Sequence, residues 1–128
     1  MKEKLINLLN NSYSPYSKFK VAAIVITRDE KYFCGVNVEN SSYGGSICAE
    51  RNAINSAISS GYKRYDFKGL YVMCDSDIIG TPCFICRATI NEMFDKDCDV
   101  VCMNPRGDIK TFKVSDLCPY PFDDGNLK

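Results

Sequence analysis

Two short blocks of the sequence carry the residues best suited to chemistry. The first contains Cys48 and Glu50, and the second contains Cys83 and Cys86. Cysteines at this last spacing share one face of a helix and are a common thiolate pair for zinc. Cys48 adds a third sulfur, which leaves the fourth tetrahedral position open, as in catalytic zinc sites. If both blocks begin helices, Glu50 can reach the site and act as a general acid or base beside a metal-activated water.

The second cysteine pair alone is also compatible with a redox centre or with half of a structural zinc site. A redox pair would not need the block containing Cys48 and Glu50, and a structural zinc would need a fourth ligand. The sequence has no second C-x-x-C and no histidine, so nitrogen ligation and Ser-His or Cys-His nucleophile pairs are excluded. The combined pattern favours catalytic zinc.

Charge balance at such a site needs further groups. Three thiolates outweigh the charge of one zinc ion, which would reduce its Lewis acidity. The positive ends of two helix dipoles would oppose that effect. Arg51 and Arg87 each directly follow a site residue, and we expect both to donate hydrogen bonds to sulfur.

Length and composition indicate one globular domain that spans residues 1–128. Hydrophobic residues make up 45% of the chain and charged residues 25%, which is ordinary for such a domain. The 16 basic side chains equal the 16 acidic ones in number. This balance argues weakly against a nucleic-acid partner and favours a neutral small substrate.

The eight cysteines raise the question of compartment. The first residues are charged and lack the long apolar core of a secretory signal, and no run is long enough for a membrane span. We therefore expect no membrane association, a cytoplasmic location and reduced cysteines.

Hydrophobic periodicity predicts the elements that must position the two blocks. The predicted helices cover 2–11, 48–60 and 83–94, and the predicted strands cover 19–27, 32–38, 69–74, 100–103 and 109–114. A hairpin followed by strands linked through helices indicates one α/β domain with a mixed sheet and helices on its faces. The Ser/Gly/Asn-rich segment 39–47 is predicted to be a loop, where binding residues commonly lie.

The two blocks resemble the C-A-E-R and P-C-x-x-C motifs of the cytidine deaminases in their three-cysteine form. Three other segments resemble further family motifs, namely Y-S-x-F-x-V at 16–21, N-x-E-N at 37–40 and L-x-P-x-x-F at 117–122. The resemblance implies a three-layer α/β/α fold with a five-stranded sheet. It also implies zinc-dependent hydrolytic deamination of cytidine and deoxycytidine in pyrimidine salvage, one zinc per chain, and a homotetramer.

Substrate contacts also follow from this resemblance. It assigns Asn37 and Glu39 to the sugar 3′-hydroxyl and Phe19 to stacking on the base. From the residues alone, the first two alternate along a predicted strand end and therefore point the same way, as ordinary exposed polar residues often do. The resemblance adds Ala49 to the substrate-binding residues.

Two aromatic residues are assigned by the resemblance to sites that neighbouring subunits complete. These residues are Tyr43 and Phe122, which without the resemblance would be predicted to pack in the chain itself. The resemblance also assigns the role of sulfur hydrogen-bond donor to Arg51.

The sequence departs from the family pattern P-C-G-x-C-R-Q at two positions. Phe84 replaces the glycine and Ala88 replaces the glutamine. Neither is a predicted ligand, so the chemistry is expected to be retained while substrate breadth and kinetics are affected. Three alternatives remain: a deaminase of another cytosine nucleoside such as blasticidin S, a nucleic-acid editor, and a non-enzymatic zinc module.

Overall fold

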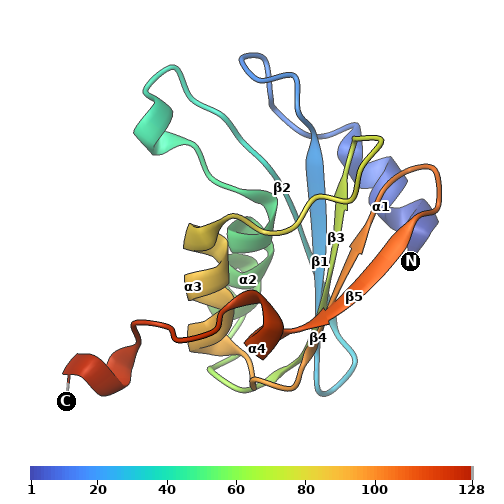
Figure 1. The fold of residues 1–128 in the computed structure, drawn as a ribbon. Helices are drawn as coiled ribbons and strands as arrows, with labels where there is room; N and C mark the ends of the chain where they lie inside the picture. Colours follow the sequence, from blue (N-terminus) through green and yellow to red (C-terminus); the bar gives the residue numbers. More distant parts are fainter. Residues whose placement is uncertain (128) are drawn as a thin grey trace.

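The structure is a computed structural model that describes residues 1–127. Its centre is a five-stranded sheet in the order β2-β1-β3-β4-β5, as Figure 1 shows. Strands β3 and β4 are parallel, and the other neighbouring pairs are antiparallel. The strands are β1 Val21–Thr27, β2 Tyr32–Val36, β3 Phe67–Cys74, β4 Asp99–Met103 and β5 Ile109–Lys113.

Helices cover both faces of this sheet (Figure 1). Helix α1 packs on one face, and α2 and α3 pack on the other. The helices are α1 Lys2–Leu9, α2 Ala49–Ser59, α3 Phe84–Met93 and the short α4 Val114–Leu117, with 3₁₀ turns at η1 Tyr43–Gly45 and η2 Asp124–Leu127. The predicted three-layer α/β fold with a mixed five-stranded sheet is confirmed. No helix within residues 1–127 is long and apolar enough to cross a membrane.

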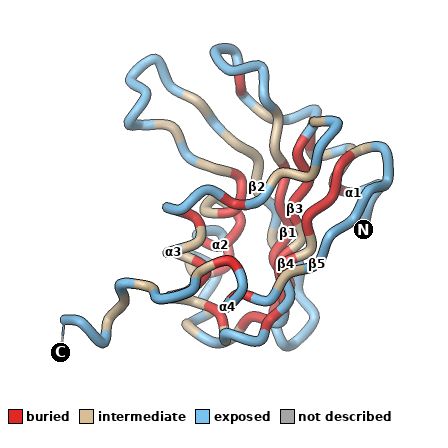
Figure 2. The backbone as a smooth tube through the Cα atoms, in the orientation of Figure 1, coloured by how far each residue is buried: buried red, intermediate tan, exposed pale blue. Residues whose placement is uncertain are grey.

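The hydrophobic core lies on both sides of strand β1. Alternate side chains of a strand point to opposite faces, so Ala23 and Val25 join the cluster under α2 and α3, while Ala22 and Ile24 join the cluster under α1. Figure 2 shows this burial concentrated in the middle of the sheet. A strand buried on both faces needs a continuous apolar run, which is what the sequence has there.

Several element boundaries differ from the predicted ones in ways that matter for function. Helices α2 and α3 begin one residue later than predicted, so Cys48 and Cys83 are their N-caps. Strand β2 ends at Val36 rather than at residue 38. Beyond it Val38 forms isolated bridges to Tyr13 and Ile47, because the chain there pairs with two loops instead of continuing along β1. Helix α1 is shorter than predicted, and β3 begins earlier.

Gly35 sets how closely α2 approaches the sheet. A Cβ atom at this residue would lie 2.4 Å from the Ala49 carbonyl oxygen and 2.4 Å from the Ala53 nitrogen. Real Cβ atoms do not approach backbone atoms this closely, so only glycine allows the observed contact. The start of α2, which carries Cys48 and Glu50, is thereby held directly against β2.

Candidate metal centre and substrate cavity

Three thiols meet at the N-terminal ends of α2 and α3. The sulfur atoms of Cys48, Cys83 and Cys86 all lie within 4.8 Å of one another, and the first two are 3.7 Å apart. The three-residue spacing of Cys83 and Cys86 places both at one helix start, and the packing of α2 beside α3 brings Cys48 to them. The proximity of two thiols thus follows from their spacing in the sequence, whereas the position of the third depends on how the helices pack.

Local electrostatics favour ionised sulfur at this cluster. Hydrogen bonds with Cys86, Arg51 and Cys83, led by the bond with Cys86, together lower the pKa of the Cys48 thiol to about 5. The Arg51 guanidinium donates from Nη2 to the Cys48 sulfur at 3.6 Å. Helix N-termini add positive partial charge at the same place. The cluster is therefore prepared to hold at least one thiolate.

The donor set fits zinc. Three close thiols and a neighbouring guanidinium match the ligands and the charge compensation of a thiolate zinc site. The Nε atom of Arg51 is buried and has no hydrogen-bond partner in the described part of the chain. A buried cationic group beside the thiols is stabilised when those sulfurs carry negative charge, as they do when they ligate a metal.

Glu50 lies in the first turn of α2 and is almost fully buried, with 4% of its surface exposed. Burial, with a smaller contribution from the negative charge of Cys48, raises the pKa of its carboxyl group to about 7. A carboxyl group with this pKa both accepts and returns protons near neutral pH. Its position at the cavity makes it the strongest general acid/base candidate in the site.

One cavity joins these groups to most of the residues predicted to bind substrate. It has a volume of about 330 Å³ and opens beside the thiol cluster. Its lining includes Phe19, Asn37, Glu39, Cys48, Ala49, Glu50 and Cys83. It also includes Ser17, Val21, Cys74 and Thr81, which were not predicted. Thr81 adjoins the Cys83 block, and Ser17 lies in the 16–21 motif, so their sequence positions were available signals.

The side-chain amide of Asn37 makes three hydrogen bonds within the protein. Its side-chain nitrogen donates to the Phe19 carbonyl oxygen at 2.7 Å, and its side-chain oxygen accepts from the Val21 nitrogen at 2.9 Å and from the Ser12 hydroxyl. The amide therefore holds the chain around Phe19 at the start of β1. A side-chain amide has two N–H donors, so one remains for a ligand in the cavity.

Glu39 is held by the turn that precedes β1. Its carboxylate accepts hydrogen bonds from the Tyr16 nitrogen at 3.0 Å, from the Ser17 nitrogen at 3.1 Å and from the Ser17 hydroxyl. These bonds, led by that of the hydroxyl, lower the pKa of Glu39. A carboxylate has about four acceptor positions, so about one is left for a ligand.

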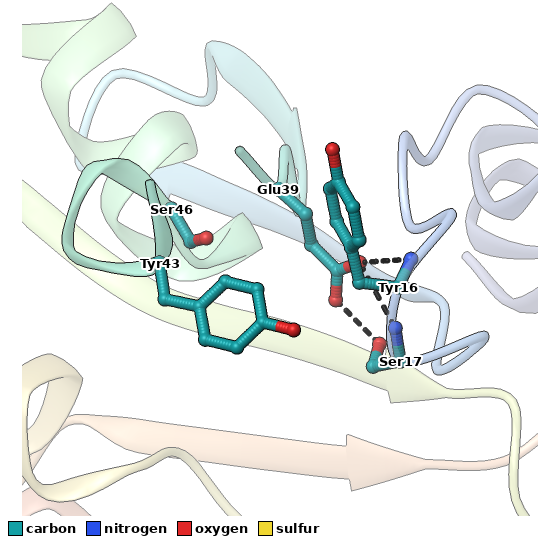
Figure 3. A pocket seen from close by; sticks show the side chains of 5 residues that line it. All are labelled: Tyr16, Ser17, Glu39, Tyr43 and Ser46. Atoms are coloured by element: carbon teal, nitrogen blue, oxygen red, sulfur yellow. Dashed lines mark hydrogen bonds between the residues drawn. The ribbon is translucent and has the colours of Figure 1, made fainter. Parts of the chain in front are cut away.

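A second, outer pocket of about 270 Å³ shares Glu39 and Ser17 with the thiol-lined cavity. Figure 3 shows the Glu39 carboxylate directed toward Tyr16 and Ser17, with Tyr43 beside them. The rings of Tyr16 and Tyr43 meet edge to face at 5.9 Å. Tyr43 thus contributes to this outer pocket and does not line the thiol-lined cavity.

Two further predicted residues line neither pocket. Phe122 is 74% exposed, in the segment that leaves the body after α4 (Figure 1). The expectation that Phe122 completes the site of a neighbouring subunit stays a prediction. Arg87 does not follow the prediction that it donates to sulfur. The three hydrogen bonds of its side chain go to oxygen atoms of Thr81, Pro82 and Leu117, so its donors are directed to the segment before Cys83 and to the end of α4.

Comparisons with known proteins agree with this site. A family model described as the cytidine and deoxycytidylate deaminase zinc-binding region matches residues 1–103. The chain is 48% identical over 118 residues to a probable cytidine deaminase of Dictyostelium discoideum, covering 88% of this chain and 76% of that one. It is 37% identical over 120 residues to a cytidine deaminase of Halalkalibacterium halodurans, covering 94% and 89%.

Solved structures extend the similarity to three dimensions. A crystal structure of cytidine deaminase from Burkholderia pseudomallei superposes with a TM-score of 0.90 at 38% identity, covering 94% of each chain. A cytidine deaminase structure from Mycobacterium leprae gives a TM-score of 0.74 at 31% identity, covering 93% of this chain and 94% of that one.

Proposed function

The chain belongs to the cytidine deaminase family, and on that premise we propose that it converts cytidine and deoxycytidine to uridine and deoxyuridine with release of ammonia. The observation that carries this proposal is the convergence of three thiols and a buried glutamate beside one open cavity, which Cys48, Cys83 and Glu50 line. We further propose that one zinc ion is held per chain by Cys48, Cys83 and Cys86. Such an ion supplies the Lewis acidity that makes water a nucleophile at neutral pH.

The protein groups then have separable tasks in the reaction. Glu50 accepts a proton from the attacking water, whose oxygen forms the new bond to C4 of the cytosine ring. It passes this proton to ring N3, then accepts the second proton from the hydroxyl now on C4 and delivers it to the amine. The C4–N bond breaks, the C4 carbonyl forms and ammonia leaves. Phe19 offers its 42% exposed ring as a stacking surface for the base. The cavity residue Ala49 lies between the ligand and the acid/base group in sequence and bounds the base on that side.

The sugar is assigned to Asn37 and Glu39, each of which retains hydrogen-bonding capacity. A phosphate in the same place would meet the negative charge of Glu39, at a cost of several kcal/mol in rough terms. No Lys or Arg is among the residues that line either pocket in the described chain. This favours a nucleoside over a nucleotide, although the family model includes deoxycytidylate deaminases.

Assembly and location belong to the same proposal. Large apolar side chains are strongly exposed on one chain, which is typical of surfaces that other chains cover; they are Tyr43, Phe84, Ile85, Tyr120 and Phe122. We propose a homotetramer in which Tyr43 and Phe122 complete the site of a neighbouring copy. The free state of all eight cysteines supports a cytoplasmic enzyme of pyrimidine salvage.

The direct test is the loss of ultraviolet absorbance when purified protein is added to cytidine. Deoxycytidine should also be consumed, whereas cytidine monophosphate, deoxycytidylate and free cytosine should be poor substrates. Free cytosine lacks the sugar contacts that orient C4 in the cavity. Equal kcat/KM for cytidine and its monophosphate would contradict the role given to Glu39, and no turnover of any nucleoside would contradict the function itself.

A sharper test of the sugar assignment removes one partner at a time. The wild-type protein should have a lower kcat/KM for 3′-deoxycytidine than for cytidine, because the free acceptor position of Glu39 then has no sugar hydroxyl to bind. In Glu39→Gln the difference in kcat/KM between cytidine and 3′-deoxycytidine should be smaller, since the substitution and the loss of the 3′-hydroxyl remove the same contact. Ser17→Ala is the matched control, because it removes a partner of Glu39 but keeps the carboxylate. A difference that persists in Glu39→Gln would show that the hydroxyl binds elsewhere.

A further inference from the structure

Arg87 connects two parts of the chain through a single guanidinium group. Its Nε donates to the Pro82 carbonyl oxygen at 2.7 Å, and its Nη2 donates to the Thr81 hydroxyl at 2.8 Å. Its Nη1 donates to the Leu117 carbonyl oxygen at 3.0 Å. Two of these acceptors precede the thiol Cys83, and the third closes α4. A planar fork of donors suits three fixed acceptors, whereas a lysine ammonium does not reproduce that geometry.

The first two acceptors belong to the wall of the thiol-lined cavity. Thr81 and Cys83 both line it, and Pro82 between them is buried. A hydrogen bond to the Pro82 carbonyl and another to the Thr81 hydroxyl therefore fix the backbone and a side chain on the same edge of the cavity. Small displacements of such positioning groups are costly, because the reacting atoms must be held in a narrow geometry.

Phe84 covers the same guanidinium. The carbon at the centre of the Arg87 group lies 4.5 Å from the centre of the Phe84 ring. A cation over an aromatic face is attracted to it, and the ring also limits the approach of water. The replacement of the family glycine at this position therefore has a structural partner in this chain, namely Arg87.

The third acceptor extends the connection to the C-terminal segment. Leu117 ends α4 and is nearly buried, and the exposed Phe122 follows soon after it. The hydrogen bond from Arg87 thus fixes the point from which that segment leaves the body, while the same side chain fixes the cavity wall. The Arg87 guanidinium therefore couples the position of the cavity wall to that of the C-terminal segment.

We propose that Arg87 is a positioning residue for the deamination reaction, holding the Thr81–Cys83 wall of the cavity and the exit of the C-terminal segment in one arrangement. This inference rests on the proposed function. It assigns to Arg87 a task distinct from that of Arg51, which contacts the sulfur of Cys48.

Kinetics and metal content separate the two arginines. Arg87→Lys should lower kcat/KM for cytidine by roughly 10- to 100-fold while the zinc content stays as in the wild type. Cobalt-substituted Arg87→Lys should keep the wild-type thiolate-to-metal absorption, whereas Arg51→Lys should change it. Guanidinium ion at millimolar concentration should restore part of the activity of Arg87→Ala, and ethylammonium should not.

The control variant is Arg106→Lys, because Arg106 is an exposed arginine paired with the exposed Asp77 at 3.1 Å. It should behave as the wild type in every assay. If Arg87→Lys keeps kcat/KM within about twofold of the wild type, or if its cobalt spectrum changes as that of Arg51→Lys does, the positioning role is wrong. Thermal melts of each variant identify any loss of folding.

A readout that needs no activity completes the test. The Cys118 amide donates to the Val114 carbonyl oxygen at 3.1 Å at the end of α4. In Arg87→Lys its hydrogen exchange should become faster, while exchange in α2 stays unchanged. Unchanged exchange at Cys118 would contradict the link to the C-terminal segment. If the wild type did not deaminate cytidine, the proposed function would fail, yet this exchange measurement would still decide whether Arg87 fixes α4.

Discussion

At the scale of single residues, Glu50 combines two properties that rarely occur together. It is almost fully buried, and yet it lines the cavity beside the thiols. Burial raises the pKa of its carboxyl group to about 7, whereas Glu39, in contact with hydroxyl and amide donors, has a lowered pKa. The two environments suit the different tasks proposed for these carboxylates, proton transfer for Glu50 and hydrogen-bond acceptance for Glu39.

Glu50→Gln tests the first of these tasks. The amide preserves the shape of the side chain but cannot shuttle protons, so kcat should fall by at least roughly 10²- to 10⁴-fold while fold and zinc content are retained. Steady-state deamination of cytidine and metal analysis of the same sample measure this. Glu39→Gln is the matched control and should act mainly on KM. Turnover close to that of the wild type in Glu50→Gln would refute the assignment.

The metal ligands can be tested without any substrate. Purified protein should contain about one zinc per chain, and Cys83→Ala should lose most of it, because a thiolate ligand is removed from a three-ligand site. Cys34→Ala is the matched control, since this exposed thiol is not part of the cluster. Metal analysis after dialysis provides the comparison. Full zinc in Cys83→Ala would disprove the proposed ligand set.

At the scale of elements, the position of α2 against β2 decides whether the site forms. The helix carries Cys48 at its N-cap and Glu50 in its first turn, so any shift of the helix moves a ligand and the acid/base group together. Gly35 is the contact that permits the observed distance. Its absence of a side chain is therefore a requirement of the site as well as of the fold.

Gly35→Ala should destabilise the protein by about 1–3 kcal/mol or more, because the added Cβ would meet two backbone atoms that cannot give way separately. Thermal unfolding measures the stability, and deamination of cytidine measures the effect on the site. Gly44→Ala is the control for stability, since a Cβ there would meet nothing within 4 Å. Equal melting temperatures for the wild type and Gly35→Ala would show that α2 adjusts freely.

At the scale of the whole molecule, exposed aromatic residues support the proposed homotetramer. Phe122 and Phe84 are each more than 70% exposed, at 74% and 77%. They lie on the C-terminal segment and at the start of α3, elements that Arg87 joins. Covering them with other copies would bury apolar surface and bring residues outside the cavity close to it.

Sedimentation should therefore give a tetramer of the 14.4 kDa chain. Phe122→Ala should lower activity and weaken the assembly, because an aromatic side chain in a subunit contact contributes much of its energy. Leu127→Ala is a suitable control, since Leu127 is a similarly exposed apolar residue near the end of the chain, at 78%. A fully active wild-type monomer would contradict the proposal that sites are shared.

The sequence by itself determined the features that depend on neighbours along the chain. The apolar run of β1, the helix periodicity of α2 and α3, and the close spacing of Cys83 and Cys86 are local, so they predicted the elements and two thiols. The resemblance of the motifs then identified the family. Helix starts were predicted to within one residue, which was enough to place Cys48 and Glu50 at one end of α2.

The tertiary structure decided what depends on partners far away in the chain. The strand pairing beyond Val36, the hydrogen bonds that occupy Asn37 and Glu39, and the direction of Arg87 all involve residues from other elements. Arg87 follows a ligand in sequence, but its donors reach Leu117 because α4 packs beside α3. Side-chain direction is set by such contacts and not by spacing alone, which is why the sequence named this residue correctly as part of the site's surroundings and gave it the wrong partner.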